Sequence, residues 1–500
     1  MNRGWAWVLA FGIALGGLAQ EAETDLPTSF TAPLTLEPGA EPPEEPITEA
    51  GSPPEAPAPE PEPEPAPKPP PASEQPVPTP EEEPAPAQLG HFESEVDSFF
   101  ATVCEVHPDP YHTLSPDQFE LWQKEVKSAL TPNLDRLGFY KLLAPAAAAI
   151  GDSETQVLPP REDFLEFAQG GGLVFPLLLD LSGQLPVVVA DLGADIPPGS
   201  QILNIGGQPV WRSLSEPLTW ISGAWEPARR ARLQKELPLY WWLAYGEVEE
   251  LELLVATPNG ERQNLVVTGV PYDQWPGAVA EPISWKVFPS GVAHLLINDF
   301  AGDSARFLFT LNGLFDEMER RGADRLILDL TNASGGDPNL ARMLMFFFTD
   351  APFRMYARVE TKVSDPVRSL HPGDPNVSQA ENGEILTAEP QEEMPPPGPR
   401  FSGDLYVLIG PATAGPAASV AAVVKDYQLG TLVGEETGGL ATRYGGIYRF
   451  ALGESGLEAE VPHQRFVRPA GFDDGRGVLP DLEIPARQAL DDLLTRLGAN

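Results

Sequence analysis

The sequence is poor in cysteine and histidine, and this scarcity argues against several kinds of site. Its 500 residues contain one cysteine, Cys104, and six histidines. A lone cysteine provides no disulfide framework, and the histidines show no His-x-x-x-His spacing. We therefore expect no metal and no other cofactor. Cys104 lies within an apolar pattern of helical spacing, which predicts a buried, inert thiol.

Basic residues are also scarce. Lysine and arginine total 32 against 73 aspartates and glutamates, for a formal net charge of -41. Phosphate groups would repel such a chain, and no basic patch with interleaved aromatic residues is present. The composition therefore argues against a nucleic-acid partner, and we interpret the acidity as a source of solubility.

Long apolar runs are missing as well. The run from Trp5 to Leu15 follows Arg3 and precedes small residues that end at Ala19. This order is typical of a secretory signal peptide, and the run is shorter than the about 20 apolar residues of a membrane span. Residues 1–19 are therefore predicted to be a signal peptide that directs export to the periplasm, the cell envelope or the exterior. An uncleaved membrane anchor is the alternative.

Proline is concentrated near the N-terminus. Of the 58 prolines, 22 lie between Glu21 and Gly90, where large apolar side chains are almost absent. Alternating proline and glutamate favour an extended polyproline II conformation, and such a segment buries too little apolar surface to fold. Residues 20–90 are predicted to be a disordered linker that acts as a spacer.

The remaining chain divides into three regions by pattern. Residues 91–158 show apolar residues at helical spacing. Residues 159–275 contain short apolar strands and a tight-hairpin signal at Asn259-Gly260. In residues 280–497, apolar strands alternate with helices, which predicts parallel βαβ units. A proline-rich excursion at 372–399 is predicted to be a surface insertion.

Three glycine-containing loops follow strands of the last region. They span residues 329–336, 410–418 and 434–439. Functional sites in α/β sheets form where strands end and helices begin, and glycines let backbone N–H groups face a ligand. These loops are the candidate site.

The order of these loops resembles the tail-specific, or C-terminal processing, serine peptidases, which are related to tricorn-core peptidases. The resemblance covers roughly residues 91–497 and includes further motifs at 105–111, 151–155, 199–210 and 477–481. It implies an α/β fold with a crotonase-like ββα core, an N-terminal helical subdomain and a β-rich PDZ-like module. It also implies an extended peptide or a protein C-terminus as the partner.

The catalytic positions depart from the family pattern. Gly415 stands where the resemblance places the serine nucleophile, and glycine cannot form an acyl-enzyme. Glu154 stands at the position of the histidine base, and Leu440 follows the loop where other branches carry a lysine base. Pro416 follows Gly415 and has no N–H to donate to an oxyanion. Nucleophile, base and one oxyanion donor are therefore all changed.

The resemblance also implies a peptide groove. Thr331 and Ala333 occupy positions at which the family usually carries an arginine and an asparagine. Strand addition of a peptide uses backbone edges and needs no nucleophile. The groove and oxyanion region would comprise seven residues: Gly335, Gly336, Thr413, Ala414, Pro416, Gly438 and Gly439.

We therefore expect a catalytically inactive family member that retains its groove. One alternative is an active peptidase with a displaced nucleophile, Ser419 or Ser334. Glu154 paired with Glu435 or Glu436 would offer acid–base chemistry, whereas His107 is interpreted as a packing residue. A second alternative is a structural cell-envelope protein that the Pro/Glu spacer presents to envelope components.

Overall fold

The computed structural model describes residues 87–193, 195–275, 281–398 and 400–499. The predicted signal peptide and nearly all of the predicted linker lie outside these residues. Helix α1 (Ala87–Val106) begins inside the range that was predicted to be linker. No helix of the described part is both long and apolar enough to cross a membrane.

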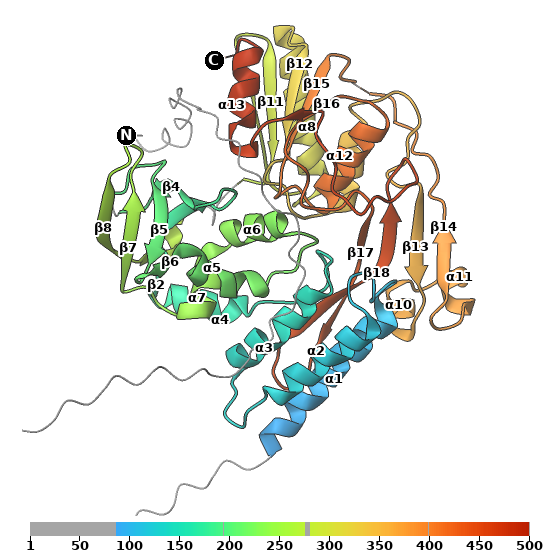
Figure 1. Ribbon diagram of the computed structural model, residues 1–500. Helices are drawn as coiled ribbons and strands as arrows, with labels where there is room; N and C mark the ends of the chain where they lie inside the picture. Colours follow the sequence, from blue (N-terminus) through green and yellow to red (C-terminus); the bar gives the residue numbers. More distant parts are fainter. Residues whose placement is uncertain (1–86, 194, 276–280, 399, 500) are drawn as a thin grey trace, which may run out of the picture. The chain divides into compact units, whose positions relative to one another are not determined.

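The N-terminal region is helical, as predicted. Helices α1, α2 (Pro116–Ser128) and α3 (Arg136–Ala149) follow one another along the chain. Ser115 caps α2 by accepting from the Gln118 N–H, while the Gln118 side chain accepts from the Ser115 N–H, and Pro116 occupies the first helical position. The helices lie along one another at the blue end of the described chain in Figure 1.

The next region combines short strands with four helices. A six-stranded antiparallel sheet has the order β3-β4-β5-β7-β8, with β6 beside β5. This sheet contains the predicted hairpin, in which β7 and β8 pair from Glu250↔Thr268 to Ala256↔Arg262 around Asn259-Gly260. The strands are β1 (Gln156–Val157), β2 (Leu173–Val174), β3 (Leu177–Asp180), β4 (Val187–Asp191), β5 (Gln201–Ile205), β6 (Gln208–Pro209), β7 (Glu250–Ala256), β8 (Arg262–Thr268) and β9 (Val270–Pro271). The helices are α4 (Arg161–Gln169), α5 (Val210–Thr219), α6 (Glu226–Lys235) and α7 (Leu237–Tyr245), followed by the 3-10 turn Tyr272–Gln274.

The core of the C-terminal region is a six-stranded sheet of order β10-β11-β12-β15-β16-β19. Strands β11 to β19 of this order pair in parallel, and β10 is antiparallel at one edge. The strands are β10 (Ile283–Val287), β11 (Val292–Ile297), β12 (Arg325–Asp329), β15 (Asp404–Ile409), β16 (Thr431–Gly434) and β19 (Leu482–Glu483). The predicted alternation of parallel strands and helices is confirmed, and with it the α/β fold class.

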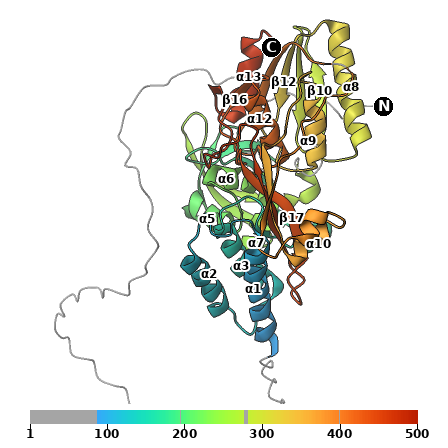
Figure 2. The same cartoon turned by 90° about the vertical axis from the view of Figure 1, so that its right-hand side faces the viewer.

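Alternate residues of each core strand face opposite sides of the sheet. Leu326, Leu328 and Val407 pack in the cluster that includes helices α8 (Ser304–Arg321), α9 (Pro338–Met345) and α12 (Pro416–Asp426). Ile327 and Leu408 pack instead with α13 (Ala486–Arg496). Figures 1 and 2 show α13 on one face of the sheet and the other three helices on the opposite face. The sheet is therefore buried on both sides, which suits parallel strands.

A second sheet, which the sequence did not predict, joins distant parts of the chain. Its order is β1-β18-β13-β14, with β17 also paired to β18. The strands outside the helical region are β13 (Arg358–Lys362), β14 (Ile385–Ala388), β17 (Arg443–Ala451) and β18 (Glu458–Val467). The proline-rich stretch is only partly a surface insertion, because it contributes α11 (Pro375–Gln379) and β14, whose edge pairs with β13. The short helix α10 (Asp365–Leu370) precedes it.

Candidate functional site

The three predicted loops come together at one edge of the core sheet. They follow β12, β15 and β16, which are neighbours in the sheet, so their carboxyl ends meet. The Ala414 N–H donates to the Ala333 carbonyl at 2.9 Å, which joins the first two loops. The Gly438 N–H donates to the Gly410 carbonyl at 3.3 Å, which joins the second and third. The clustering expected from the sequence is present.

Gly415 caps the N-terminus of α12 in a conformation that suits glycine. Its φ of 55° and ψ of -127° lie in a region that L-residues rarely adopt. A Cβ placed there would have Ser334 O, at 3.7 Å, as its nearest heavy atom. The position therefore has room for a side chain but supplies none. Pro416 follows as the first helical residue, so the expected loss of its N–H coincides with a helix start that favours proline.

Several of the predicted groove residues hold the loops together. Thr413 is fully buried, and its hydroxyl donates to the Leu330 carbonyl at 2.8 Å while accepting from the Gly410 N–H at 2.9 Å. The Gly439 N–H donates to the Thr413 carbonyl at 2.9 Å. A Cβ at Gly438 would lie 1.9 Å from Pro411 O. Close packing of the loops thus explains these residue types.

The backbone N–H groups that remain available in the loops include those of Gly335 and Gly415. Within the described part of the chain, neither the Gly335 N–H nor the Gly415 N–H donates a hydrogen bond. Gly336 is required for another reason, because a Cβ there would lie 2.2 Å from Phe300 O. The oxyanion region therefore keeps donors at Gly335 and Gly415 but not at Pro416.

Glu154 is held by a tight turn. The Asp152 carboxylate accepts the backbone N–H groups of Glu154 and Thr155, both at 2.6 Å. The Asp152 side chain is in turn braced by His107, whose Nε2 lies 3.3 Å from Oδ2 of Asp152. Nδ1 of His107 accepts the Asp109 N–H at 3.0 Å, so the proton on this ring is assigned to Nε2. His107 is therefore a buried packing residue, as interpreted from the sequence.

Glu154 lines two cavities, and its carboxylate has no hydrogen-bond or ion-pair partner among the described residues. Burial raises the pKa of Glu154 above its ordinary value. The charges of Arg443 and Arg232 oppose this shift, whereas those of Asp152 and Glu460 add to it. A carboxylate with a raised pKa in a cleft is a functional-site candidate.

Ser419 does not have the environment of a nucleophile. Its hydroxyl is buried, donates to the Gly415 carbonyl at 3.3 Å, and accepts from Nε of Arg443 at 3.1 Å. The Tyr356 hydroxyl lies 3.1 Å away on the same oxygen. An arginine is not a general base, because its guanidinium stays protonated. The geometry therefore gives no support to Ser419 as a displaced nucleophile.

Ser334 has a different partner. Its hydroxyl accepts from Nζ of Lys235, the last residue of α6, at 2.8 Å. Both side chains are exposed, and in this contact the lysine is the donor. This contact ties α6 to the first loop.

The proposed pairing of Glu154 with Glu435 or Glu436 is absent, because both of the latter are structural. Glu435 accepts the Ala486 N–H at the start of α13, at 2.8 Å. Glu436 forms an ion pair with Arg476 at 2.6 Å and accepts the Gly477 N–H at 2.9 Å. These contacts use the carboxylates to fasten the third loop to the segment after β18.

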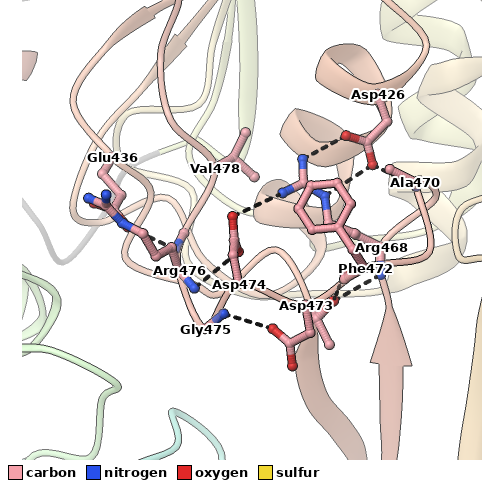
Figure 3. Close-up of polar contacts among 12 residues, drawn as sticks. Asp426, Glu436, Arg468, Ala470, Phe472, Asp473, Asp474, Gly475, Arg476 and Val478 are labelled. Atoms are coloured by element: carbon pink, nitrogen blue, oxygen red, sulfur yellow. Dashed lines mark hydrogen bonds and ion pairs between the residues drawn. The ribbon is translucent and has the colours of Figure 1, made fainter.

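That segment, residues 468–478, is anchored at both ends (Figure 3). At one end Arg468 forms a buried pair with Asp426 of α12, at 2.6 Å, and its guanidinium stacks on Phe472. At the other end is the Arg476–Glu436 pair. Residues 473 and 475 between them line a cavity, so the anchors position one wall of the site.

Three cavities adjoin the site. The α6 cavity, of about 220 Å³, lies between α6 and the three loops and includes Glu154, Arg232 and Lys235. The Gly415 cavity, of about 10 Å³, is lined by Asp152, Ser153, Glu154, Gly415, Gly439, Leu440, Arg443 and Tyr444. The Tyr444 cavity, of about 600 Å³, also includes Leu440. Glu154 lines both the α6 cavity and the Gly415 cavity, and Leu440 lines both the Gly415 cavity and the Tyr444 cavity. The three cavities therefore follow one another, with the Gly415 cavity in the middle.

Sequence reasoning missed the basic residues of the site. Arg443 lies four residues after Gly439, and Arg232 and Lys235 share one face of α6, but no motif marked any of them. The prediction for Cys104 needs correction, because this residue is half-buried, with Sγ 3.4 Å from the Tyr111 hydroxyl. In the described part of the chain, no group of three or more His, Cys, Asp or Glu side chains is placed to hold a metal ion.

The fold and loops together are those of a tail-specific peptidase. Residues 291–484 match the family model of peptidase family S41. The structure of mature CPAF has a TM-score of 0.61 to this chain at 14% identity, and the match covers 82% of this chain and 96% of CPAF. Mature CPAF complexed with lactacystin gives 0.59, also at 14% identity, with 82% and 98% covered. The photosystem II D1 C-terminal processing protease gives 0.46 at 16% identity, with 82% and 98% covered.

The match to peptidase family S41 therefore covers the C-terminal core, residues 291–484, and the likeness to the CPAF structures shows the fold of the chain. The resemblance drawn from the order of its loops is confirmed. The likeness to CPAF extends over nearly the whole described chain and concerns the fold alone at this level of identity.

Proposed function

We propose that this protein binds peptides in the cleft of an S41 peptidase fold and has lost acyl-enzyme catalysis. The observation that carries the proposal is Gly415, which stands at the head of α12 where the family places its nucleophile. Pro416 removes one oxyanion donor, and Leu440 is an apolar side chain at the wall of the Gly415 cavity. Ser419 is engaged by Arg443 and does not replace the missing group.

The cavities beside Gly415 support peptide binding. The α6 cavity and the Tyr444 cavity are large enough for side chains, and the free N–H groups of Gly335 and Gly415 can donate hydrogen bonds to a peptide carbonyl. An extended peptide or a protein C-terminus suits such a series of cavities. The proposed partner class follows the family, whose members act on peptides.

Peptide binding can be tested with an array of peptides and with fluorescence anisotropy on the purified protein. Ala231→Trp would fill the α6 cavity from the helix side, and we expect it to weaken binding at least about 10-fold. Lys124→Trp, on an exposed position of α2 with 73% side-chain exposure, is the matched control and should bind as the parent does. If no peptide binds, or if both variants bind as the parent does, the groove proposal is wrong.

We also propose that the protein is exported and works outside the cytoplasmic membrane. Support comes from the order of charged, apolar and small residues at positions 3–19. Cell fractionation with N-terminal sequencing of the mature protein tests this. Pull-down with and without residues 20–86 separates groove binding from the structural alternative, in which the spacer alone would capture envelope components.

A further inference from the structure

The Gly415 cavity has the size of a single water molecule. Its volume of about 10 Å³ is close to the minimum that holds one water. A water also needs polar partners, and this cavity offers the Glu154 carboxylate and the Gly415 N–H, neither of which is engaged by another described residue. Gly415 itself is one of the residues that line the cavity.

The turn that carries Glu154 beside this cavity has a rigid support. Its backbone N–H and that of Thr155 are both held by Asp152, which is itself braced by His107. Pre-orientation of this kind is what a general base requires, because the proton must be within hydrogen-bond reach. The same support would have little purpose for a solvated surface glutamate.

We propose that Glu154 is a general base that activates a water in the Gly415 cavity for direct hydrolysis of acyl esters and amides bound in the α6 cavity. The water oxygen bonds to the acyl carbon as its proton passes to the Glu154 carboxylate. The carbonyl electron pair moves onto oxygen, which accepts a hydrogen bond from the Gly335 N–H. When the tetrahedral adduct collapses, the bond to the leaving oxygen or nitrogen breaks, and that atom takes the proton back from Glu154.

The charges around Glu154 suit this role. Arg443 from β17 and Arg232 from α6 stabilise the carboxylate, while Asp152 of the same turn and Glu460 of β18 oppose its ionisation. Burial raises the pKa of Glu154, which makes its carboxylate a stronger base than an exposed one. Lys235 and Glu236 line the α6 cavity farther along α6.

This reaction goes beyond peptide binding and needs no serine. The full chain would be assayed with a set of N-acetyl amino-acid p-nitrophenyl esters, which require only that the acyl group enter the α6 cavity. We expect hydrolysis above the buffer rate, with kcat/KM rising with pH to a midpoint above the ordinary glutamate value of about 4.3. Glu154→Gln, nearly the same in shape, should lower kcat/KM about 100-fold or more and abolish that pH limb.

Two further variants test whether hydrolysis depends on the site around Glu154 and not on carboxylates in general. Gly415→Ala would place a methyl group 3.7 Å from Ser334 O, at the wall of the α6 cavity, so the acyl group would fit less well and hydrolysis should fall at least about 10-fold while circular dichroism reports a folded protein. Glu120→Gln, an exposed carboxylate of α2 with 67% side-chain exposure, should hydrolyse the esters as the parent does. Intact-mass spectrometry of acid-quenched reactions should show no acyl adduct.

The proposal is overturned if the parent protein does not exceed the buffer rate, or if Glu154→Gln is as fast as the parent. An acyl adduct on Ser334 or Ser419 would also overturn it, because attack would then come from a serine and not from water. These outcomes are independent of peptide binding. If the protein binds peptides but does not hydrolyse esters, the proposed function stands and the Glu154 mechanism is wrong. If it hydrolyses esters but binds no peptide, the Glu154 mechanism stands and the proposed function is wrong.

Discussion

Nε2 of His107 lies 3.3 Å from Oδ2 of Asp152, and both side chains are buried. Burial by itself would raise the pKa of Asp152, but the hydrogen bond and charge of His107, together with hydrogen bonds from Thr155, lower it to about 2. The pair fixes the turn that carries Glu154. It joins the segment after α1 to the loop before β1.

The shift at Asp152 predicts a pH dependence of stability. The folded pKa of about 2 lies below the unfolded value of about 3.9, so the stabilisation is complete above pH 3.9 and is lost as pH falls toward 2. A difference of this size corresponds to about 2–3 kcal/mol. Urea unfolding between pH 5 and pH 2 should show a steeper decline for the parent than for Asp152→Asn. Asp492→Asn, which removes half of the surface pair with Arg496, should keep the parental slope.

A serine at position 415 should not restore serine-peptidase activity. Gly415→Ser would place a hydroxyl beside Glu154 but leaves Pro416 without an N–H and Leu440 in place of an amine. We expect no labelling by a fluorophosphonate probe. The positive φ of 55° should also cost about 1–2 kcal/mol of unfolding free energy. Gly415→Ala should show the same destabilisation, which would assign the loss to the backbone. Strong labelling of the serine variant would refute this view of the site.

Breaking the Arg468–Asp426 ion pair should lower the free energy of unfolding far more than breaking an exposed ion pair (Figure 3). Its side chains are 7% and 6% exposed, and Asp426 also accepts the Ala470 N–H. Asp426→Ala would leave a buried guanidinium without its partner, and we expect a loss of about 3–5 kcal/mol in chemical denaturation. Asp492→Ala, at the exposed pair with Arg496, should cost no more than about 1 kcal/mol. Equal effects would mean that Arg468 finds another partner.

A histidine pair gives a second pH dependence, in a different range. Nε2 of His463 lies 2.8 Å from Nε2 of His371. Burial, and then the charge of His371, lower the pKa of His463 to about 4. The pKa of this histidine in the unfolded chain is about 6.5. Below that pH the unfolded state binds the proton more readily than the folded state does, so protonation favours unfolding. Unfolding free energy should therefore fall by up to about 3 kcal/mol between pH 6.5 and pH 4. His463→Asn should flatten this range, and an unchanged curve would show that the pair does not control it.

The sequence predicted most of the core because its signals are local. The alternation of apolar strands and helices predicted for residues 280–497 is seen in strands such as β11 (Val292–Ile297) and β16 (Thr431–Gly434). The Asn259-Gly260 signal located the β7–β8 hairpin, because such a turn needs residues that tolerate positive φ. The second sheet was missed because its pairings, such as Arg358↔Val467, join residues far apart in the chain.

The candidate site was predicted in part for the same reason. Gly415, Glu154 and Leu440 were found as departures from a motif order, and the structure brings all three to the wall of one cavity. Arg443 was not found, because an arginine in a strand carries no positional signal. Thr413 and Gly439 were assigned to a groove, whereas their hydrogen bonds hold the loops together.

By itself, the sequence determined the α/β class, the resemblance to a peptidase family and the presence of a glycine at position 415, since these depend on residue types and their order. Tertiary structure decided what that loss leaves behind. Only folding brings Glu154, from the loop after α3, beside Gly415 at the head of α12, and encloses a water-sized cavity between them. The pKa of Glu154 depends on its burial and on the charges near it, and the hydrogen bond from Arg443 to Ser419 depends on the distance between them. A local sequence pattern specifies neither burial nor distance.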